Sequence, residues 1–365
     1  MTSRAAIILS GGKARRFQSE GANWLDKAFV ELKGKPLLIH AIKNFTSIVD
    51  EIAVCVNDEQ RKEKYRKILD EQSLTNIKIV VDKKISHISG PNLAIFSGLT
   101  AVEADYCFTL HCDMPFLQPA VAAYMFKEAS GFDVAVPMWP NGRLETLTMV
   151  LKRQTALEIT ETLCRLKRPR SDDIPRGANR LLLVSPVNKV KMIDPELQSF
   201  ININSKEDLT RLQTRISHGP VKENLPLNLG VASTSDLKLL RDCTKMLQER
   251  KLSEAHSTFG SCAGNFEVTH SYFWAAISCE NQGEALLKLS QQQSEPAAAT
   301  KLDFEGKEAF VRAANNYRVE AEMYLENRCM LLAERACADK AWCESWAMGK
   351  AGHVHRYSPK YHKRA

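Results

Sequence analysis

Short apolar runs alternate with segments of helical periodicity along the first half of the chain. Runs of four to seven mostly apolar residues, bounded by glycine or polar residues, are typical of buried strands in a parallel sheet. Between them, apolar residues recur at helical spacing or charged residues dominate. This alternation predicts an open, mostly parallel, Rossmann-like α/β sheet with helices on both faces, whose ligands lie beyond the carboxyl ends of the strands. The expected strands are 5–9, 51–57, 77–81, 106–110, 132–137 and 143–150, and the expected helices are 37–45, 59–72 and 92–102.

The pattern changes near residue 216, where Gly-Pro and Leu-Pro pairs break the chain and helix formers then dominate. Four apolar helical stripes predict two antiparallel helix pairs, a helical-hairpin (TPR-like) domain without a clean 34-residue repeat. Such arrays bind partners more often than they catalyse, so a protein partner or self-association is expected here. The stripes cover 236–253, 271–289, 308–325 and 327–348. The predicted domains are a first domain at 1–217, a linker at 218–230, a helical domain at 231–350 and a basic tail at 351–365.

Composition narrows the function classes. The chain has 365 residues, enough for two domains, each with its own hydrophobic core. Its net charge of +7 is spread along the sequence, so small anionic ligands explain it and nucleic-acid binding is not required. Ten cysteines without a CxxC pair indicate a reducing, cytoplasmic compartment. No apolar run approaches the roughly 20 residues that span a bilayer. The C-terminal cysteines and histidines lack the close spacing of a zinc site.

The first apolar run ends in the pair Gly11-Gly12, followed by Lys13, Arg15 and Arg16. Two glycines allow a tight bend whose backbone N–H groups, flanked by cations, suit a polyphosphate. The alternative is a glycine turn followed by a basic helix start that faces water.

Asp113 directly follows the strand 106–110 and precedes Pro115, which forces the chain to turn. A carboxylate at this strand end is a candidate Mg²⁺ ligand beside a triphosphate, because Mg²⁺ takes one or two carboxylates plus phosphate oxygens and water. The alternative is a turn acid before proline. We expect His111 and Cys112 to pack in the interior rather than to bind a transition metal.

Two amides, Asn202 and Asn204, share one face of a short strand expected at 199–204 and would point into the same cleft. Alternatively, Asn204 or Ser205 merely caps the following helix. The polar segment 167–180 is expected to be a mobile surface loop, either closing over an anionic substrate or simply solvated.

Four segments in order carry a family resemblance: 9–16, 26–37, 112–115 and 200–204. Together they resemble the molybdenum cofactor guanylyltransferases, within the glycosyltransferase-A-like nucleotidyltransferases, over about residues 4–214. The resemblance implies a GT-A-type fold and a Mg²⁺-dependent transfer of GMP from GTP to molybdopterin, with release of pyrophosphate.

The same resemblance implies roles for particular residues. Lys13 and Arg16 would contact the phosphates, Lys27 would neutralise the transferring phosphate, and Asp113 would hold Mg²⁺. The residues implied for nucleotide binding are Leu9, Ser10, Gly11, Gly12, Lys13, Asn57 and Asp82. Those implied near the metal and the pterin are Asn202 and Asn204, and those implied to be catalytic are Lys27, Arg16 and Asp113.

The sequence departs from the family pattern at two places. Phe17-Gln18 replaces a small residue in the first motif, and the segment 90–95 carries an insertion and lacks its last glycine. The acid upstream of that segment is either Asp82 or displaced by Lys83. Two alternatives therefore stay open: a transferase that uses CTP or another phosphorylated acceptor, such as a sugar phosphate or phospholactate, and a non-catalytic nucleotide-binding adaptor that acts through its helical domain.

Overall fold

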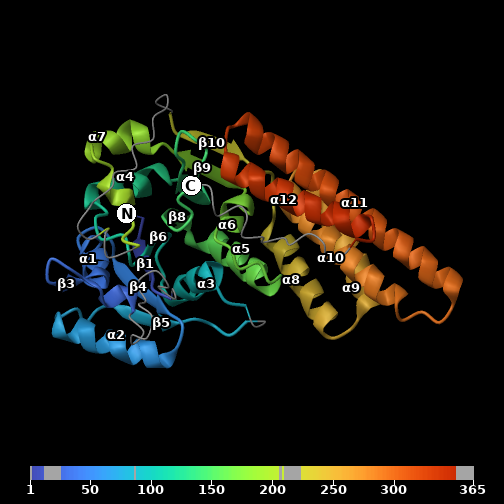
Figure 1. Cartoon of the computed structure of the whole chain (residues 1–365), viewed down its shortest axis with the longest axis horizontal. Coiled ribbons are helices and arrows are strands. Elements are labelled where there is room, and N and C mark those ends of the chain that lie inside the picture. Colours follow the sequence, from blue (N-terminus) through green and yellow to red (C-terminus); the bar gives the residue numbers. More distant parts are fainter. Residues whose placement is uncertain (1, 12–25, 86–87, 205–207, 209–222, 351–365) are drawn as a thin grey trace. The chain divides into compact units, whose positions relative to one another are not determined.

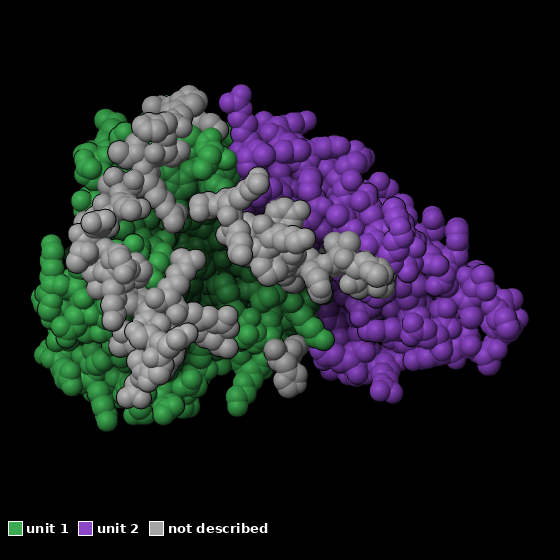
Figure 2. Space-filling model, viewed as in Figure 1, with its two compact units in different colours: residues 1–227 green, residues 228–365 purple. Residues whose placement is uncertain are grey.

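The computed structural model describes residues 2–11, 26–85, 88–204, 208 and 223–350 (Figure 1). The chain divides into two compact units, 1–227 and 228–365 (Figure 2). Each is described by itself below. Within the described residues, no helix is long and apolar enough to cross a membrane.

The first unit is built on an eight-stranded sheet of order β10-β9-β7-β8-β6-β1-β4-β5. β1 lies in its interior and pairs in parallel with β4 and β6, whereas β8 is antiparallel to both β6 and β7. The predicted mostly parallel sheet is therefore confirmed. Its strands are β1 (Arg4–Leu9), β4 (Glu51–Val56), β5 (Lys78–Val81), β6 (Tyr106–His111), β7 (Val134–Pro137), β8 (Met149–Lys152), β9 (Arg180–Val184) and β10 (Leu225–Asn228), and a separate hairpin joins β2 (Glu31–Leu32) to β3 (Lys35–Pro36).

Helices cover both faces of this sheet, as predicted. Ala6 and Ile8 of β1 belong to a core that they share with α1, α2 and α4. Ile7 points to the other face, where a Cβ on Gly98 of α3 would overlap its side chain. Because alternate residues of a strand face opposite ways, a strand buried on both faces reads as one continuous apolar run. The helices of this unit are α1 (Leu37–Lys43), α2 (Glu59–Glu71), α3 (Pro91–Ala101), α4 (Pro119–Glu128), α5 (Arg153–Arg165), α6 (Asp173–Arg176) and α7 (Lys191–Ile193), with the short turns η2 (Lys27–Phe29), η3 (Pro186–Val190) and η4 (Gln198–Phe200).

Two predicted strands are wrong. The strand expected at 143–150 begins only at Met149, because Thr148 N–H donates to the Glu145 carbonyl at 2.8 Å and turns the chain just before it. The strand expected at 199–204 is not formed: 198–200 is the turn η4, and 201–204 is irregular.

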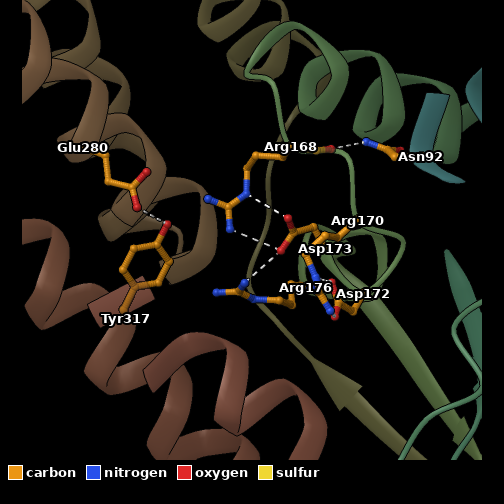
Figure 3. Close-up of polar contacts among 8 residues, drawn as sticks. All are labelled: Asn92, Arg168, Arg170, Asp172, Asp173, Arg176, Glu280 and Tyr317. Carbon is orange, nitrogen blue, oxygen red and sulfur yellow. Dashed lines mark hydrogen bonds and ion pairs between the residues drawn. The ribbon is translucent and has the colours of Figure 1, made fainter. Parts of the chain in front are cut away.

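The segment 167–180, predicted as a mobile surface loop, is instead folded and largely buried. It contains α6, and Asp173 accepts hydrogen bonds from Arg168 Nε at 2.9 Å and from Arg176 Nη1 at 2.9 Å (Figure 3). All three side chains are at most 4% exposed. The prediction was wrong because composition counts charges but does not show that they neutralise one another.

The second unit is all-helical, as predicted, and each helix packs on its neighbour in sequence. Its helices are α8 (Thr234–Gln248), α9 (Leu252–Val268), α10 (Tyr272–Ser290), α11 (Pro296–Glu326) and α12 (Met330–Ala347). Helix α9 is not among the predicted helices, because the helix predicted at 236–253 runs through the turn at Arg250, where φ is +60°. Helix α11 begins twelve residues before the predicted start at 308, since its first three turns have one buried residue and carry no apolar stripe. That this unit binds a protein partner stays a prediction.

Candidate active site

The carboxyl ends of three neighbouring strands meet at one edge of the sheet. In the ladder, Leu9 of β1 lies opposite Cys55 of β4 and His111 of β6. The pairing continues one step further, since Ser10 N–H donates to the Cys55 carbonyl at 3.0 Å and Cys112 N–H donates to the Leu9 carbonyl at 3.1 Å. Gly11, Asn57 and Asp113, which follow these three strands, therefore lie at the same edge of the sheet, as the strand order requires.

Two cavities open at this edge, of about 300 and 270 Å³, and both include His111 and Leu147 in their walls. The first brings together residues that the sequence assigned to the nucleotide, with a glycine-proline wall: Leu9, Gly11, Asn57, Asp82, Gly90 and Pro91. The second brings together those assigned to the metal and the pterin: Asp113, Asn202 and Asn204. The candidate nucleotide-binding residues and the candidate metal and pterin residues thus line two adjoining cavities.

Asp82 stands out in the first cavity. Burial raises the pKa of its carboxyl to about 6, and the charge of Arg61 offsets only part of that rise. Counting only residues that the structure describes, the buried Asp82 Oδ1 has no hydrogen-bond partner. The neighbouring Lys83 uses its backbone N–H on Ser97 Oγ and places its ammonium 5.4 Å from the ring centre of Phe96. Of the two candidates for the acid position, Asp82 is the one that lines the cavity.

The wall of this cavity at Gly90 is supported from behind by residues 168–173. Gly90 has φ +137°, and a Cβ there would lie 2.9 Å from the Pro169 carbonyl oxygen, so the position requires glycine. Asn92 donates from its backbone to the Pro169 carbonyl at 3.2 Å and from Nδ2 to the Arg168 carbonyl at 2.9 Å (Figure 3). The buried ion pair of Arg168 with Asp173 therefore fixes the backbone carbonyls to which Asn92, at the start of α3, donates.

Lys27 reaches the second group of residues from a separate part of the chain. Its Nζ donates to Asp113 Oδ2 and to Asn204 Oδ1, the latter at 2.9 Å. It begins the turn η2, which Asp26 caps by accepting the Ala28 N–H at 3.1 Å. A lysine, a carboxylate and an amide from three distant segments thus meet at one point.

Asp113 is held ionised. Burial alone would raise its pKa, but His111 and Lys27 outweigh that effect and hold the pKa at about 2. His111 Nδ1 lies 2.9 Å from Asp113 Oδ1, although the two atoms are not aligned for a hydrogen bond. Sequence reasoning assigned His111 to packing, whereas it lines both cavities, and its place at the strand end was the signal that could have found it.

Asn204 is fixed by backbone contacts rather than by a strand. Ile203 N–H donates to the Asp113 carbonyl at 2.9 Å, and Asn204 N–H donates to Asp208 Oδ2 at 2.7 Å. Its side-chain oxygen accepts from Lys27, whereas the backbone that it could cap, at 205–207, lies outside the described residues. Gly12, Lys13 and Arg16, together with Arg15 and Phe17, lie outside the described residues.

The donor set suits Mg²⁺. Asp113, Asn202 and Asn204 offer carboxylate and amide oxygens, the hard ligands that Mg²⁺ prefers. Asp113 Oδ1 is buried and, within the described part of the chain, makes no hydrogen bond. The described residues include no cluster of three or more His, Cys, Asp or Glu side chains that could hold a metal ion. A single carboxylate is enough where phosphate oxygens and water supply the remaining ligands.

An open α/β sheet that gathers a nucleotide-sized cavity, a lysine and a carboxylate at one edge has the construction of a nucleotidyltransferase. A sequence model of the family described as "MobA-like NTP transferase domain" matches residues 6–181. The chain is 33% identical over 209 residues to a probable molybdenum cofactor guanylyltransferase of Methanosarcina acetivorans, covering 57% of this chain and 88% of the relative. It therefore belongs to the molybdenum cofactor guanylyltransferase family.

A second curated relative agrees. A probable molybdenum cofactor guanylyltransferase of Methanosarcina mazei is 32% identical, with 61% of this chain and 94% of that protein covered. Among solved structures, molybdopterin-guanine dinucleotide biosynthesis protein A from Archaeoglobus fulgidus is 25% identical, covers 57% of this chain and 95% of its own, and has a TM-score of 0.46. The family match ends at residue 181, within the first unit.

Proposed function

We propose that this enzyme transfers GMP from GTP to molybdopterin, releases pyrophosphate and uses Mg²⁺. The observation that carries the proposal is the convergence of Lys27, Asp113 and Asn204 beside a cavity that contains Asp82. The names of the relatives support the choice of guanylyl donor and pterin acceptor.

In this reaction the acceptor phosphate oxygen attacks the α-phosphorus of GTP in line. A bond forms between that oxygen and phosphorus while the bond to the pyrophosphate oxygen breaks. The protein has little proton transfer to perform, so it acts mainly by positioning two anions and neutralising them. Lys27 would place its positive charge at the transferring phosphate. Asp113, Asn202 and Asn204 would hold Mg²⁺, which when bound offsets the negative charge of the phosphates.

Asp82 supports guanine over cytosine in the first cavity. The carboxylate can accept two hydrogen bonds side by side, and guanine offers two adjacent N–H donors on one edge, at N1 and at the 2-amino group. Cytosine offers only one amino group there and leaves an acceptor facing the carboxylate. Because a buried group left unpaired is disfavoured, we expect GTP to be preferred over CTP.

The test follows pyrophosphate release from purified protein given each nucleoside triphosphate, Mg²⁺ and molybdopterin. We expect release with GTP only, and about a hundredfold or greater loss of kcat/KM in Lys27→Ala and Asp113→Ala. Lys67→Ala, an exposed lysine on α2, is the matched control and should retain full activity.

Each alternative gives a different result in the same assay. Release with CTP, or only with another phosphorylated acceptor, would identify the related transferase. Binding of Mg²⁺–GTP without any release would identify a nucleotide-binding adaptor.

A further inference from the structure

The mechanism above makes no use of one face of α2, where Arg61 and Tyr65 lie one helical turn apart beneath the site. Tyr65 is fully buried, yet its hydroxyl is surrounded by polar atoms. It lies 2.6 Å from Ser10 Oγ and 3.2 Å from each carboxylate oxygen of Asp26. Ser10 and Asp26 are themselves at most 7% exposed. This buried polar network joins Ser10, which the sequence assigns to nucleotide binding, to Asp26, which precedes the predicted catalytic residue Lys27.

The direction of the hydrogen bonds follows from the groups. Burial raises the pKa of Tyr65 far above its ordinary value, so the hydroxyl keeps its single proton. Tyr65 has one proton to donate, and its acceptors are the two Asp26 carboxylate oxygens at 3.2 Å and the Ser10 carbonyl at 3.3 Å. When Tyr65 donates to Asp26, its oxygen accepts from the Ser10 hydroxyl. The phenol group thus links Ser10, the residue that follows β1, to Asp26.

Asp26 passes this restraint on to Lys27. Its Oδ1 also accepts the Ala28 N–H at 3.1 Å and so caps the turn η2, which begins at Lys27. Arg61 reinforces the same contacts: its Nη1 donates to the Ser10 carbonyl at 3.3 Å, and its Nε lies 3.5 Å from Asp26 Oδ2. The backbone that carries the Lys27 ammonium is therefore fixed relative to Ser10 through Tyr65.

We propose that Tyr65 is a positioning residue for nucleotidyl transfer, which holds the turn that begins at Lys27 in place relative to Ser10, the residue that follows β1. This inference rests on the proposed function. Groups that must meet a reacting phosphate within a fraction of an ångström lose much of their effect when their support moves. Tyr65 acts through Asp26 and Ser10 and is not expected to touch the substrate.

The test is Tyr65→Phe, which removes the hydroxyl but keeps the ring that packs 4.8 Å from the ring centre of Phe29. We expect kcat for pyrophosphate release to fall about tenfold or more, with KM for GTP changed less than about threefold. Asp26→Asn should give a similar loss, and the double variant should lose little more than either single variant, because the two residues act as one unit.

The matched control is Tyr317→Phe in the helical unit. Tyr317 is also fully buried, and its hydroxyl donates to Glu280 Oε1 at 2.6 Å (Figure 3). The chemical change is the same as at Tyr65, so a general loss of stability would be shared by both variants. Only Tyr65→Phe should lower kcat.

A second readout does not depend on activity. The full-length protein is treated with an amine-acylating reagent, and labelling of each lysine is followed by peptide mass spectrometry. In Tyr65→Phe, Lys27 should react about threefold faster or more, since its contacts with Asp113 and Asn204 are loosened, while labelling of Lys67 stays unchanged. Unchanged kcat, or unchanged Lys27 labelling, would overturn the positioning role. Failure of the wild-type chain to release pyrophosphate counts against the proposed function alone, because the labelling result still decides the role of Tyr65.

Discussion

At the scale of single residues, two buried carboxyl groups at the same sheet edge are tuned in opposite directions. Burial would raise the pKa of both. Asp113 has His111 and Lys27 beside it and is held at about 2, whereas Asp82 has only the partial influence of Arg61 and is raised to about 6. Environment thus keeps Asp113 charged at any physiological pH and leaves Asp82 responsive to pH.

This difference predicts a pH dependence of GTP binding. With a pKa of about 6, Asp82 is a carboxylate at pH 7.5 and, in the proposed function, would accept N–H groups of guanine, but as the pH falls through 6 it takes up a proton and would lose that capacity. We expect the Kd for Mg²⁺–GTP to rise about tenfold for each pH unit below 6. Calorimetric titration from pH 5 to 8 measures it. Asp82→Asn should bind weakly with a flat profile, and a flat profile in the wild type would contradict the base-reading role.

The residues recovered from the sequence are those that stand at strand ends or within ordered motifs. The sequence predicts Lys27, Asp113 and Asn204 as site residues, and the structure brings them into contact. Tyr65 was not named, because its role depends on partners 55 and 39 positions away that helical periodicity does not reveal. An apolar-facing tyrosine on an amphipathic helix predicts only a core residue, and here it is also a hydrogen-bond centre.

At the scale of elements, the strand–helix alternation was predictable because apolar period alone distinguishes buried strands from amphipathic helices. The fold of the segment 167–180 was not predictable, since it depends on ion pairs among its own side chains. Asp173 lies between two guanidinium groups in a site that excludes water. A buried carboxylate with two cationic partners is stable only while every partner is present.

The same argument predicts the effect of Asp173→Asn. Removing the negative charge takes away the carboxylate that lies between the buried guanidinium groups of Arg168 and Arg176, so the free energy of unfolding of the first unit should fall by about 3–5 kcal/mol. Glu161→Gln, which breaks the exposed pair with Arg165, should change it by less than about 0.5 kcal/mol. The two changes in unfolding free energy are measured by urea unfolding, monitored through hydrogen exchange of peptides from β9. Equal effects in the two variants would show that the buried pairs are not what holds this segment.

At the scale of the whole molecule, the two units differ in how far the sequence predicted them. In the first unit, parallel pairing and strand order place the site, and the motifs mark its edge. In the second, the helices follow one another so closely that the sequence pattern predicts helix across the three residues between Gln248 and Leu252. A gap of three residues hardly interrupts the apolar stripe, so the sequence pattern does not reveal it. The turn between α8 and α9 is set by the packing of these two helices.

The junction between the units gives the last prediction. Strand β10 at 225–228 belongs to the sheet, although the first domain was expected to end at 217. Asn224 ties this strand to the unit, because its Oδ1 accepts the Ser185 N–H at 3.0 Å and its Nδ2 donates to Tyr124 and Glu128, both at 2.9 Å. A chain of residues 1–217 loses these bonds and the edge strand, whereas residues 1–228 keep them.

Each net hydrogen bond contributes about 1 kcal/mol, and for a unit of this size about 1 kcal/mol shifts Tm by about 2–4 °C. We therefore expect 1–217 to melt about 5–10 °C below 1–228 in differential scanning fluorimetry. Because every described residue that lines the two cavities lies between 9 and 204, 1–228 should bind Mg²⁺–GTP with the Kd of the full chain. Equal melting of the two fragments would show that β10 does not support the sheet, and loss of GTP binding by 1–228 would show that the helical unit is needed to form the nucleotide site.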